Sequence, residues 1–284
     1  MQKLMLRRRP GESVGFVPTM GALHEGHLSL IRRARAENDC VVVSIFVNPA
    51  QFGPREDLKK YPRPFADDAR ACRTAGVDYL FAPAADDMYP DGYATFIDVG
   101  GVSEGLCGAA RPGHFRGVAT VVAKLFNIVR PDRAYFGLKD YQQLAVIRRM
   151  ASDLNMPVKI VPCPIVRERS GLALSSRNRY LSPGVRDASA GISRALLHCR
   201  DLVVSKNVCS AAAIRAAAAR MLRSLPSAAV EYVALVDPLT LAPVRTICAP
   251  VVLLCAVRMG TTRLIYNIVI HPPRRRPCPA RHSS

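Results

Sequence analysis

The chain has 284 residues and a formal net charge of +18, with 49% hydrophobic residues, 6% aromatic residues and no tryptophan. This length can bury a full core in one large or two smaller domains, and no apolar stretch is long enough to cross a membrane. The N-terminus lacks the apolar segment of a secretory signal, so we expect a cytoplasmic protein. The basic charge favours anionic small molecules as partners, whereas the scarcity of aromatic residues argues against a dedicated nucleic-acid binder.

Strand-like and helix-like segments alternate along the chain up to about Pro164. The predicted strands are Val14–Val17, Val41–Val47, Val77–Ala82, Arg133–Phe136 and Val158–Pro162. The predicted helices are Leu28–Ala36, Phe65–Ala75, Val118–Val129 and Asp140–Leu154. The strands are continuously apolar, as expected when both faces of a sheet are covered. This alternation predicts an α/β fold with a parallel sheet wound with helices, in which ligands bind beyond the carboxyl ends of the strands.

The pattern changes after Val166. The predicted elements are alanine-rich helices at about Pro183–Val204 and Ser210–Leu225 and strands near Val230–Val236, Val251–Val257 and Thr262–Ile270. We therefore expect a first domain over residues 1–165 and a smaller α+β domain over 166–271. The basic, proline-rich tail over 272–284 is expected to be disordered.

Nine cysteines are scattered along the chain without a Cys-x-x-Cys spacing. Several lie inside apolar runs, as Cys255 does, so we expect buried thiols rather than a disulfide framework. The histidines outside one close pair are far apart in the sequence, although they could still meet in space. No protein-bound metal site is therefore predicted.

The close pair lies in Pro18–His27, which follows the first predicted strand and contains His24-Glu25-Gly26-His27. Two histidines three residues apart on a helix share one face, and the first helical turn presents unpaired N–H groups and the positive end of the dipole. Gly26 leaves no side chain between those groups and a ligand, so a nucleoside triphosphate can approach the backbone. The histidine pair could instead be surface decoration or half a metal site.

Four later motifs each follow a predicted strand or enter the second domain. Asn48–Phe52 delivers a neutral amide, Arg111–Gly117 is a basic loop suited to anions, and Gly137–Gln143 combines a cation, a carboxylate and an amide. Leu174–Asn178 offers two hydroxyls and a guanidinium that can clamp a phosphate. Singly, these residues could be solvated charges or turn caps. As one set they favour a triphosphate site.

These motifs resemble the successive motifs of the pantoate–β-alanine ligase family, nucleotidyltransferases that carry a His-x-Gly-His motif. The resemblance runs from about Val14 to Asn267. It implies a Rossmann-like N-terminal domain, a smaller C-terminal lid domain and a homodimer. It also implies the ATP-dependent condensation of pantoate with β-alanine to pantothenate, a coenzyme A precursor, through a pantoyl adenylate. AMP and pyrophosphate would be released, and Mg²⁺ would accompany ATP.

The resemblance implies roles for individual residues. Those expected to bind ATP are Met20, Gly21, Ala22, Leu23, His24, Glu25, Gly26, His27, Gly137, Leu138, Lys139, Asp140, Val166, Leu174, Ser175, Ser176 and Arg177. The expected catalytic residues are His24, His27, Lys139 and Arg177. His27 would be the proton donor. Pantoate would be held by Gln51 and Gln143, and Gln51 would also lie near β-alanine.

The chain departs from the family pattern at four positions. Ala50 stands where methionine is usual, Leu138 where glutamate is usual, and Ser170 and Tyr266 where aspartate is usual. Leu138 matters most, because it removes a carboxylate from the ATP loop. Met1–Ser13 is shorter than the strand and helix with which the family begins. Two alternatives stay open: a nucleotidyltransferase with another acceptor, and a non-catalytic relative that binds nucleotide or RNA.

Overall fold

The computed structural model describes residues 1–54 and 56–273, so most of the predicted tail lies outside the described residues. Contacts within the chain divide it into two compact units. The first contains Met1–Val166 and Leu174–Ser176, and the second contains Arg167–Ala173 and the chain from Arg177 onward.

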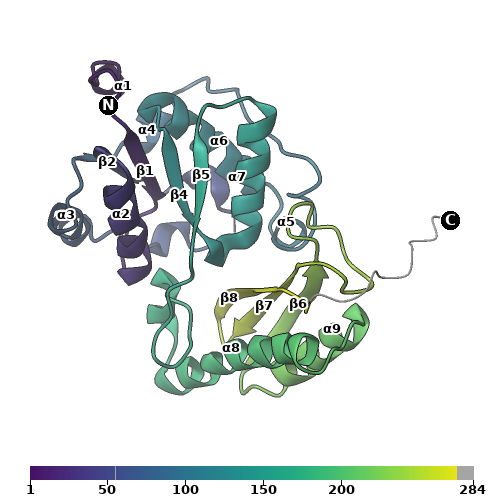
Figure 1. The fold of residues 1–284 in the computed structure, drawn as a ribbon. Helices are drawn as coiled ribbons and strands as arrows, with labels where there is room; N and C mark the ends of the chain where they lie inside the picture. Colours follow the sequence, from purple (N-terminus) through teal and green to yellow (C-terminus); the bar gives the residue numbers. More distant parts are fainter. Residues whose placement is uncertain (55, 274–284) are drawn as a thin grey trace. The chain divides into compact units, whose positions relative to one another are not determined.

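The first unit contains a five-stranded parallel sheet in the order β3-β2-β1-β4-β5 (Figure 1). The strands are β1 (Val14–Thr19), β2 (Cys40–Ile45), β3 (Tyr79–Phe81), β4 (Arg133–Gly137) and β5 (Lys159–Cys163). This confirms the predicted parallel sheet. Strand β1 pairs with β2 on one side and β4 on the other, so the strand order reverses at β1. Open α/β sheets bind ligands beyond the carboxyl ends of the strands at such a reversal.

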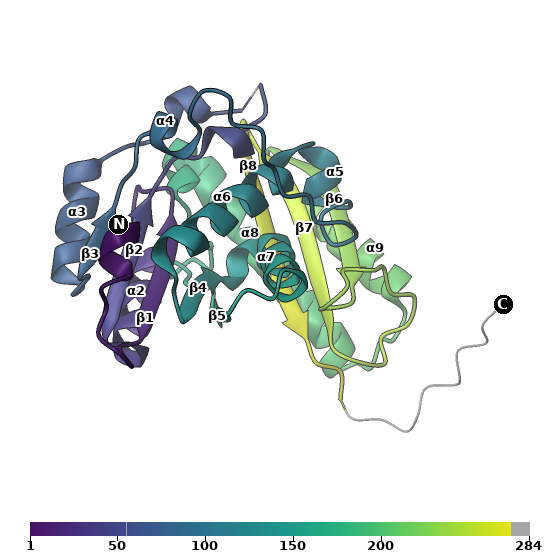
Figure 2. The same ribbon diagram turned by 90° about the horizontal axis from the view of Figure 1, so that it is seen from above.

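Seven α-helices of the first unit are described. They are α1 (Gln2–Met5), α2 (Glu25–Glu37), α3 (Phe65–Thr74), α4 (Ala85–Met88), α5 (Cys107–Ala110), α6 (His114–Val129) and α7 (Tyr141–Asp153). Figures 1 and 2 show α2 on one side of the central strands and α6 and α7 on the other. The sequence predicted the four long helices but missed α1, α4 and α5. Each of these has four residues, too few to show helical periodicity.

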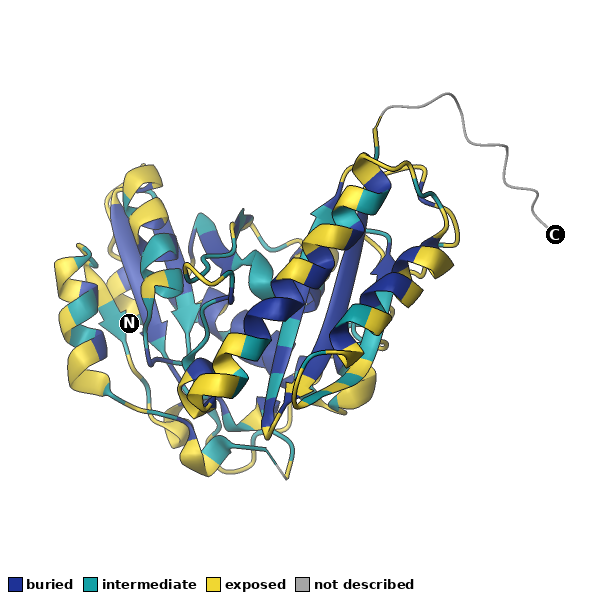
Figure 3. Ribbon diagram, turned by 90° about the horizontal axis from the view of Figure 1, so that it is seen from below, coloured by how far each residue is buried: buried dark blue, intermediate teal, exposed yellow. Residues whose placement is uncertain are grey.

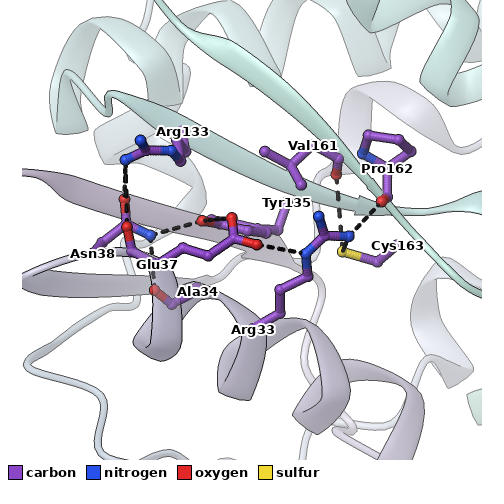
Figure 4. Close-up of polar contacts among 9 residues, drawn as sticks. All are labelled: Arg33, Ala34, Glu37, Asn38, Arg133, Tyr135, Val161, Pro162 and Cys163. Atoms are coloured by element: carbon purple, nitrogen blue, oxygen red, sulfur yellow. Dashed lines mark hydrogen bonds and ion pairs between the residues drawn. The ribbon is translucent and has the colours of Figure 1, made fainter.

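A polar network that runs from the buried Asn38 and Tyr135 to the exposed Glu37 and Arg33 fixes the C-terminal end of α2 to the sheet (Figure 4). Asn38 Nδ2 donates to the Ala34 carbonyl at 2.7 Å and to the Tyr135 hydroxyl at 2.7 Å. That hydroxyl donates to Glu37 Oε2 at 2.9 Å, and Arg33 Nε donates to Glu37 Oε1 at 2.9 Å. Buried polar groups cost little free energy when each has a partner. The network therefore anchors the helix whose opposite end carries the histidine pair.

The second unit contains an antiparallel sheet in the order β6-β7-β8. Its elements are α8 (Pro183–Val204), α9 (Ala211–Arg223), β6 (Ala228–Val236), β7 (Val251–Met259) and β8 (Thr262–Ile270). Helix α8 packs on β7 and β8, and α9 packs on β6. Figure 3 shows the helices buried along one face and exposed along the other. The predicted smaller α+β fold at the C-terminus is confirmed.

Seven cysteines are free thiols, and six of these are buried, as predicted. The expectation does not hold for Cys248, which is exposed. Among the described residues, no helix combines the length and apolarity that crossing a membrane requires.

Candidate functional site

The loop after β1 turns sharply before α2. Gly21 and Ala22 both have left-handed backbone, with φ of +80° and +50°. The Thr19 hydroxyl accepts the Gly21 N–H at 3.1 Å and donates to the Ser44 carbonyl of β2 at 2.7 Å. A left-handed conformation costs a residue such as alanine roughly 1–2 kcal/mol. Surrounding contacts must therefore hold this loop in place.

Asp68 of α3 supplies two of those contacts. One carboxylate oxygen accepts the Ala22 N–H at 2.8 Å, and the other accepts the Leu23 N–H at 2.7 Å. The residue is only 3% exposed. Sequence analysis missed Asp68, because the carboxylate lies 45 or more residues from its partners and follows another aspartate in the sequence.

His24 and His27 cap the start of α2 reciprocally. His24 Nδ1 accepts the Gly26 N–H at 3.1 Å, and His27 Nδ1 accepts the His24 N–H at 3.3 Å. The two rings stack with centroids 4.1 Å apart. The expectation of unpaired N–H groups was wrong at Gly26 and His24, because imidazole nitrogens already accept from them. A ligand beside this helix start therefore meets imidazole rings.

Gly26 has a role that differs from the predicted one. A Cβ atom at this position would lie 2.8 Å from Cε1 and 2.9 Å from Nδ1 of His24. Real Cβ atoms essentially never approach that closely. The glycine therefore leaves room for the capping ring.

The His27 imidazole is neutral at neutral pH. Burial, together with the charges of His24 and Lys139, lowers its pKa from 6.5 to about 3. Because its Nδ1 accepts the His24 N–H, its Nε2 carries the hydrogen. His27 can therefore donate a hydrogen bond through Nε2 without carrying a charge.

The motif after β4 lies beside the histidine pair. Strand β4 ends at Gly137, and the short 3₁₀ helix η3 (Leu138–Asp140) follows. Lys139 Nζ lies 3.7 Å from Asp140 Oδ1, and the Lys139 charge contributes to the lowered pKa of His27. Because β1 and β4 are neighbours, their loops bring His27 and Lys139 together. Leu138 is half-buried, and nothing in the structure explains its replacement of glutamate.

Gln51 ends the 3₁₀ helix η1 (Pro49–Gln51) after β2 and is buried. Its Nε2 lies 2.8 Å from Met20 Sδ, and its Oε1 accepts from Asn48 Nδ2 at 3.2 Å. Gly117 of α6 packs directly on this segment. A Cβ at Gly117 would lie 2.1 Å from the Ala50 carbonyl oxygen. Asn48 and Gly117, which lie in two of the predicted motifs but were assigned no role of their own, thus fix the predicted pantoate amide beside the predicted ATP loop.

The basic loop at Arg111 does not present a free cation, contrary to the expectation for this motif. Arg111 forms two hydrogen bonds of 2.6 Å to the Glu56 carboxylate. It also donates to His114 Nε2 at 2.9 Å, which leaves Nδ1 of that ring to donate to the Gln51 carbonyl at 2.8 Å. Burial and the Arg111 charge lower the pKa of His114 to about 4. The loop therefore holds the Gln51 backbone.

Gln142 and Gln143 are adjacent but differ in their surroundings. Gln142 is buried, and its side chain bonds to backbone groups. Its Oε1 accepts the Cys107 N–H at 2.9 Å. Its Nε2 donates to the carbonyls of Val102 and Gly105 at 3.0 and 2.8 Å. Gln143 is half-buried in the first turn of α7. Among the described residues, Gln51 forms its hydrogen bonds with other partners than Gln143.

The predicted phosphate clamp is divided between the two units. Leu174, whose N–H donates to the Val166 carbonyl at 3.0 Å, belongs to the first unit together with Ser175 and Ser176. The Ser176 hydroxyl lies 3.4 Å from the hydroxyl of Tyr61. Arg177 belongs to the second unit.

Two departures from the family pattern form local contacts within the second unit. The Tyr266 hydroxyl accepts the Ala173 N–H at 3.0 Å, and the Arg167 guanidinium lies 5.5 Å from the centre of the Tyr266 ring. The Ser170 hydroxyl accepts the Leu172 N–H at 3.3 Å. Both residues therefore stabilise the segment Arg167–Ala173.

Comparison with known proteins identifies the family. The family model described as pantoate–β-alanine ligase matches residues 1–269. The chain belongs to the pantoate–β-alanine ligase family. A curated member, the pantothenate synthetase of Heliobacterium modesticaldum, is 57% identical over 262 residues, which cover 92% of this chain and 93% of the relative.

Solved structures of pantoate–β-alanine ligases have the same fold. Pantothenate synthetase from Thermus thermophilus matches with a TM-score of 0.90 and 50% identity, covering 95% of this chain and 97% of that one. The ligase from Francisella tularensis, complexed with beta-gamma ATP and beta-alanine, matches with a TM-score of 0.77 and 35% identity, covering 94% of each chain. The predicted family, fold class and ligase activity are confirmed, with ATP as a substrate. Neither alternative is supported.

The two neutral histidines of this ligase predict a loss of stability in mild acid. His27 and His114 bind protons more weakly in the folded chain than in the unfolded one, so the free energy of unfolding is retained above pH 6.5 and falls below it. The decline continues to about pH 4 for His114 and about pH 3 for His27. Each of the two histidines should lower the free energy of unfolding by about 2 kcal/mol between about pH 6.5 and 5.

Urea unfolding at four pH values between about 7.5 and 5 measures this slope. Carboxylates titrate mainly below this range, so the histidines dominate. His114→Asn should remove about half of the decline. A free energy of unfolding that is constant over the acidic half of this range would contradict the neutral assignment of both rings.

Proposed function

We propose that this ligase forms pantothenate in two steps at the site built by the loops after β1, β2 and β4. The pantoate carboxylate attacks the α-phosphorus of ATP and releases pyrophosphate, which gives pantoyl adenylate. The β-alanine amine then attacks the activated carbonyl and releases AMP. The observation that carries this proposal is the gathering of His24, His27 and Lys139 at the reversal of the strand order, beside the buried amide of Gln51.

The first step needs charge neutralisation more than acid–base catalysis. A carboxylate is already nucleophilic, whereas the attacked phosphate carries negative charge that repels it. We assign the Lys139 ammonium to the phosphate oxygens, together with Arg177 and His24. At neutral pH the His27 ring is not an imidazolium, because its pKa is about 3, so it does not act as an acid that gives up a proton. His27 would instead donate a hydrogen bond to the phosphate through the N–H of its neutral ring at Nε2. This refines the proton-donor role implied by the resemblance.

The remaining ATP contacts are assigned by the same resemblance. The nucleotide would lie along the loop and helix start after β1, the segment after β4 and the chain that follows β5. The assigned residues are Met20, Gly21, Ala22, Leu23, Glu25, Gly26, Gly137, Leu138, Asp140, Val166, Leu174, Ser175 and Ser176. Gln51 and Gln143 would hold pantoate, because an amide can both donate to a carboxylate and accept from a hydroxyl.

Mg²⁺ fits this site as part of the ATP substrate. The ion is commonly held by one or two carboxylates and the substrate phosphates, and it keeps several waters. Asp140, whose side chain is 45% exposed, has the right donor chemistry. The ion would neutralise phosphate charge. We further propose that the second unit acts as the lid domain and that the enzyme is a cytoplasmic homodimer supplying coenzyme A synthesis.

Product analysis with a substrate panel tests the proposed function. Purified protein with ATP and Mg²⁺ should form AMP, pyrophosphate and pantothenate in equal amounts only when pantoate and β-alanine are both present. Other hydroxy acids and amines, supplied singly in place of pantoate or β-alanine, are the controls. Preferred turnover of another acid, or release of ADP, would overturn the assignment.

Gly26→Ala should impair the adenylation step. The added methyl group displaces the His24 ring that caps α2, because it would lie within 2.9 Å of that ring. We expect kcat/KM for ATP to fall by about tenfold, the effect of roughly one lost hydrogen bond. Steady-state kinetics at saturating pantoate measure it. Gly105→Ala is the control, since nothing lies within 4 Å of the position that its Cβ would take. Equal kinetics for both variants would contradict the capping role of His24.

A further inference from the structure

Asp68 is a buried carboxylate with an unusual set of partners. It is 3% exposed, and its two oxygens accept the N–H groups of Ala22 and Leu23 at 2.8 and 2.7 Å. Within the described part of the chain, no lysine or arginine pairs with it. A buried charge requires strong hydrogen bonds to offset its desolvation. The carboxylate and the two loop amides therefore stabilise one another.

The loop held by Asp68 is strained and reaches both substrate regions. Gly21 and Ala22 have φ of +80° and +50°, and a Cβ at Gly21 would lie 2.9 Å from Asp68 Oδ2. Met20, directly before these residues, places its Sδ 2.8 Å from Nε2 of Gln51. A shift of the loop would therefore move Met20 relative to the amide assigned to pantoate.

The two bonded N–H groups point towards α3, so they are not available to a phosphate. Through this geometry the carboxylate determines which atoms the loop can present to ATP. The side chain itself is buried against the loop, and its oxygens are occupied by backbone donors. This differs from a residue that touches the nucleotide.

We propose that Asp68 is a positioning residue that holds Met20–Leu23 in the conformation that binds ATP and sets Gln51 for pantoate. The proposal rests on the assignment of this loop to ATP. It assigns Asp68 no contact with either substrate. The neighbouring Asp67 is exposed and pairs with Arg70, so it has no such role.

Asp68→Asn and Asp68→Ala test the proposal, with Asp67→Asn as the matched control. The control removes the same charge from the same helical turn, so the effect on the dipole of α3 is shared. Asparagine keeps one accepting oxygen, whereas alanine keeps none. We expect KM for ATP and for pantoate to rise by about tenfold in Asp68→Asn and further in Asp68→Ala, with KM for β-alanine unchanged. Asp67→Asn should resemble the wild type.

Amide hydrogen exchange gives a readout that is independent of turnover. The Ala22 and Leu23 amides should exchange at least about tenfold faster in Asp68→Asn, with unchanged exchange in β4 and β5. Lower thermal stability with unchanged KM values would reduce Asp68 to a structural role and overturn the proposal. A defect relieved by raising Mg²⁺ alone would also overturn it, since Asp68 would then act on the metal. If the wild type turned over none of the proposed substrates, the proposed function would be wrong. The hydrogen-exchange result would still decide whether Asp68 holds the loop.

Discussion

Lys139→Ala should lower the rate of adenylate formation by about 100- to 1,000-fold, the effect of removing one preorganised charge-stabilising group. The Lys139 ammonium is close enough to His27 to lower the pKa of that ring, so the same charge acts where the phosphates are expected. The pKa of His27 should accordingly rise in this variant. Single-turnover measurement of adenylate formation gives the rate, and histidine NMR titration gives the pKa.

Two further variants separate charge from position. Lys139→Arg keeps the cation and should retain more activity than the alanine variant. Lys159→Ala removes an exposed lysine at the start of β5, at the opposite end of the sheet, and should leave adenylation unchanged. Adenylation unimpaired in Lys139→Ala would exclude Lys139 from the chemistry.

Gly117→Ala should lower kcat/KM for pantoate by about 100-fold. The new Cβ would lie 2.1 Å from the Ala50 carbonyl oxygen and 2.7 Å from the Gln51 nitrogen, so η1 must move. A displacement of about 1 Å can cost about 100-fold in rate when it misplaces a positioning group. Pantoate kinetics at saturating ATP measure the effect.

The control for this variant is Gly184→Ala at the start of α8, where nothing lies within 4 Å of the Cβ position. Gln51→Ala provides a second route to the same defect without a clash, which keeps the test valid if Gly117→Ala folds poorly. Wild-type pantoate kinetics in a folded Gly117→Ala variant would show that the contact does not position Gln51.

The sheet and its long helices could be predicted because their signals are local. Continuous apolar runs such as Val41–Val47 identify strands buried on both faces, and the alternation with helices identifies a parallel sheet. Helix α8 (Pro183–Val204) was predicted with its observed bounds. For helix α2 the apolar period alone begins at Leu28, whereas the helix begins at Glu25, within the histidine motif that was expected to form its first turn.

The contacts that shape the site could not be predicted in the same way. Helical spacing correctly placed His24 near His27, but not the ring nitrogens that accept backbone N–H groups. Asp68 and Glu56 reach their partners across long sequence separations, and nothing in their local sequence distinguishes them from solvated acids. Arg111 looked like an anion-binding cation because its pairing with Glu56 depends on the fold. The periodicity of apolar residues identifies helices and strands, whereas these side-chain pairings can be identified only from the folded structure.

ATP–pyrophosphate exchange tests the central claim most directly. The purified chain should exchange labelled pyrophosphate into ATP only when pantoate is present and without any need for β-alanine, because adenylate formation is the first and reversible step. Exchange that does not respond to pantoate, or none at all from folded protein that binds ATP, would contradict a pantoyl-adenylate mechanism at this site.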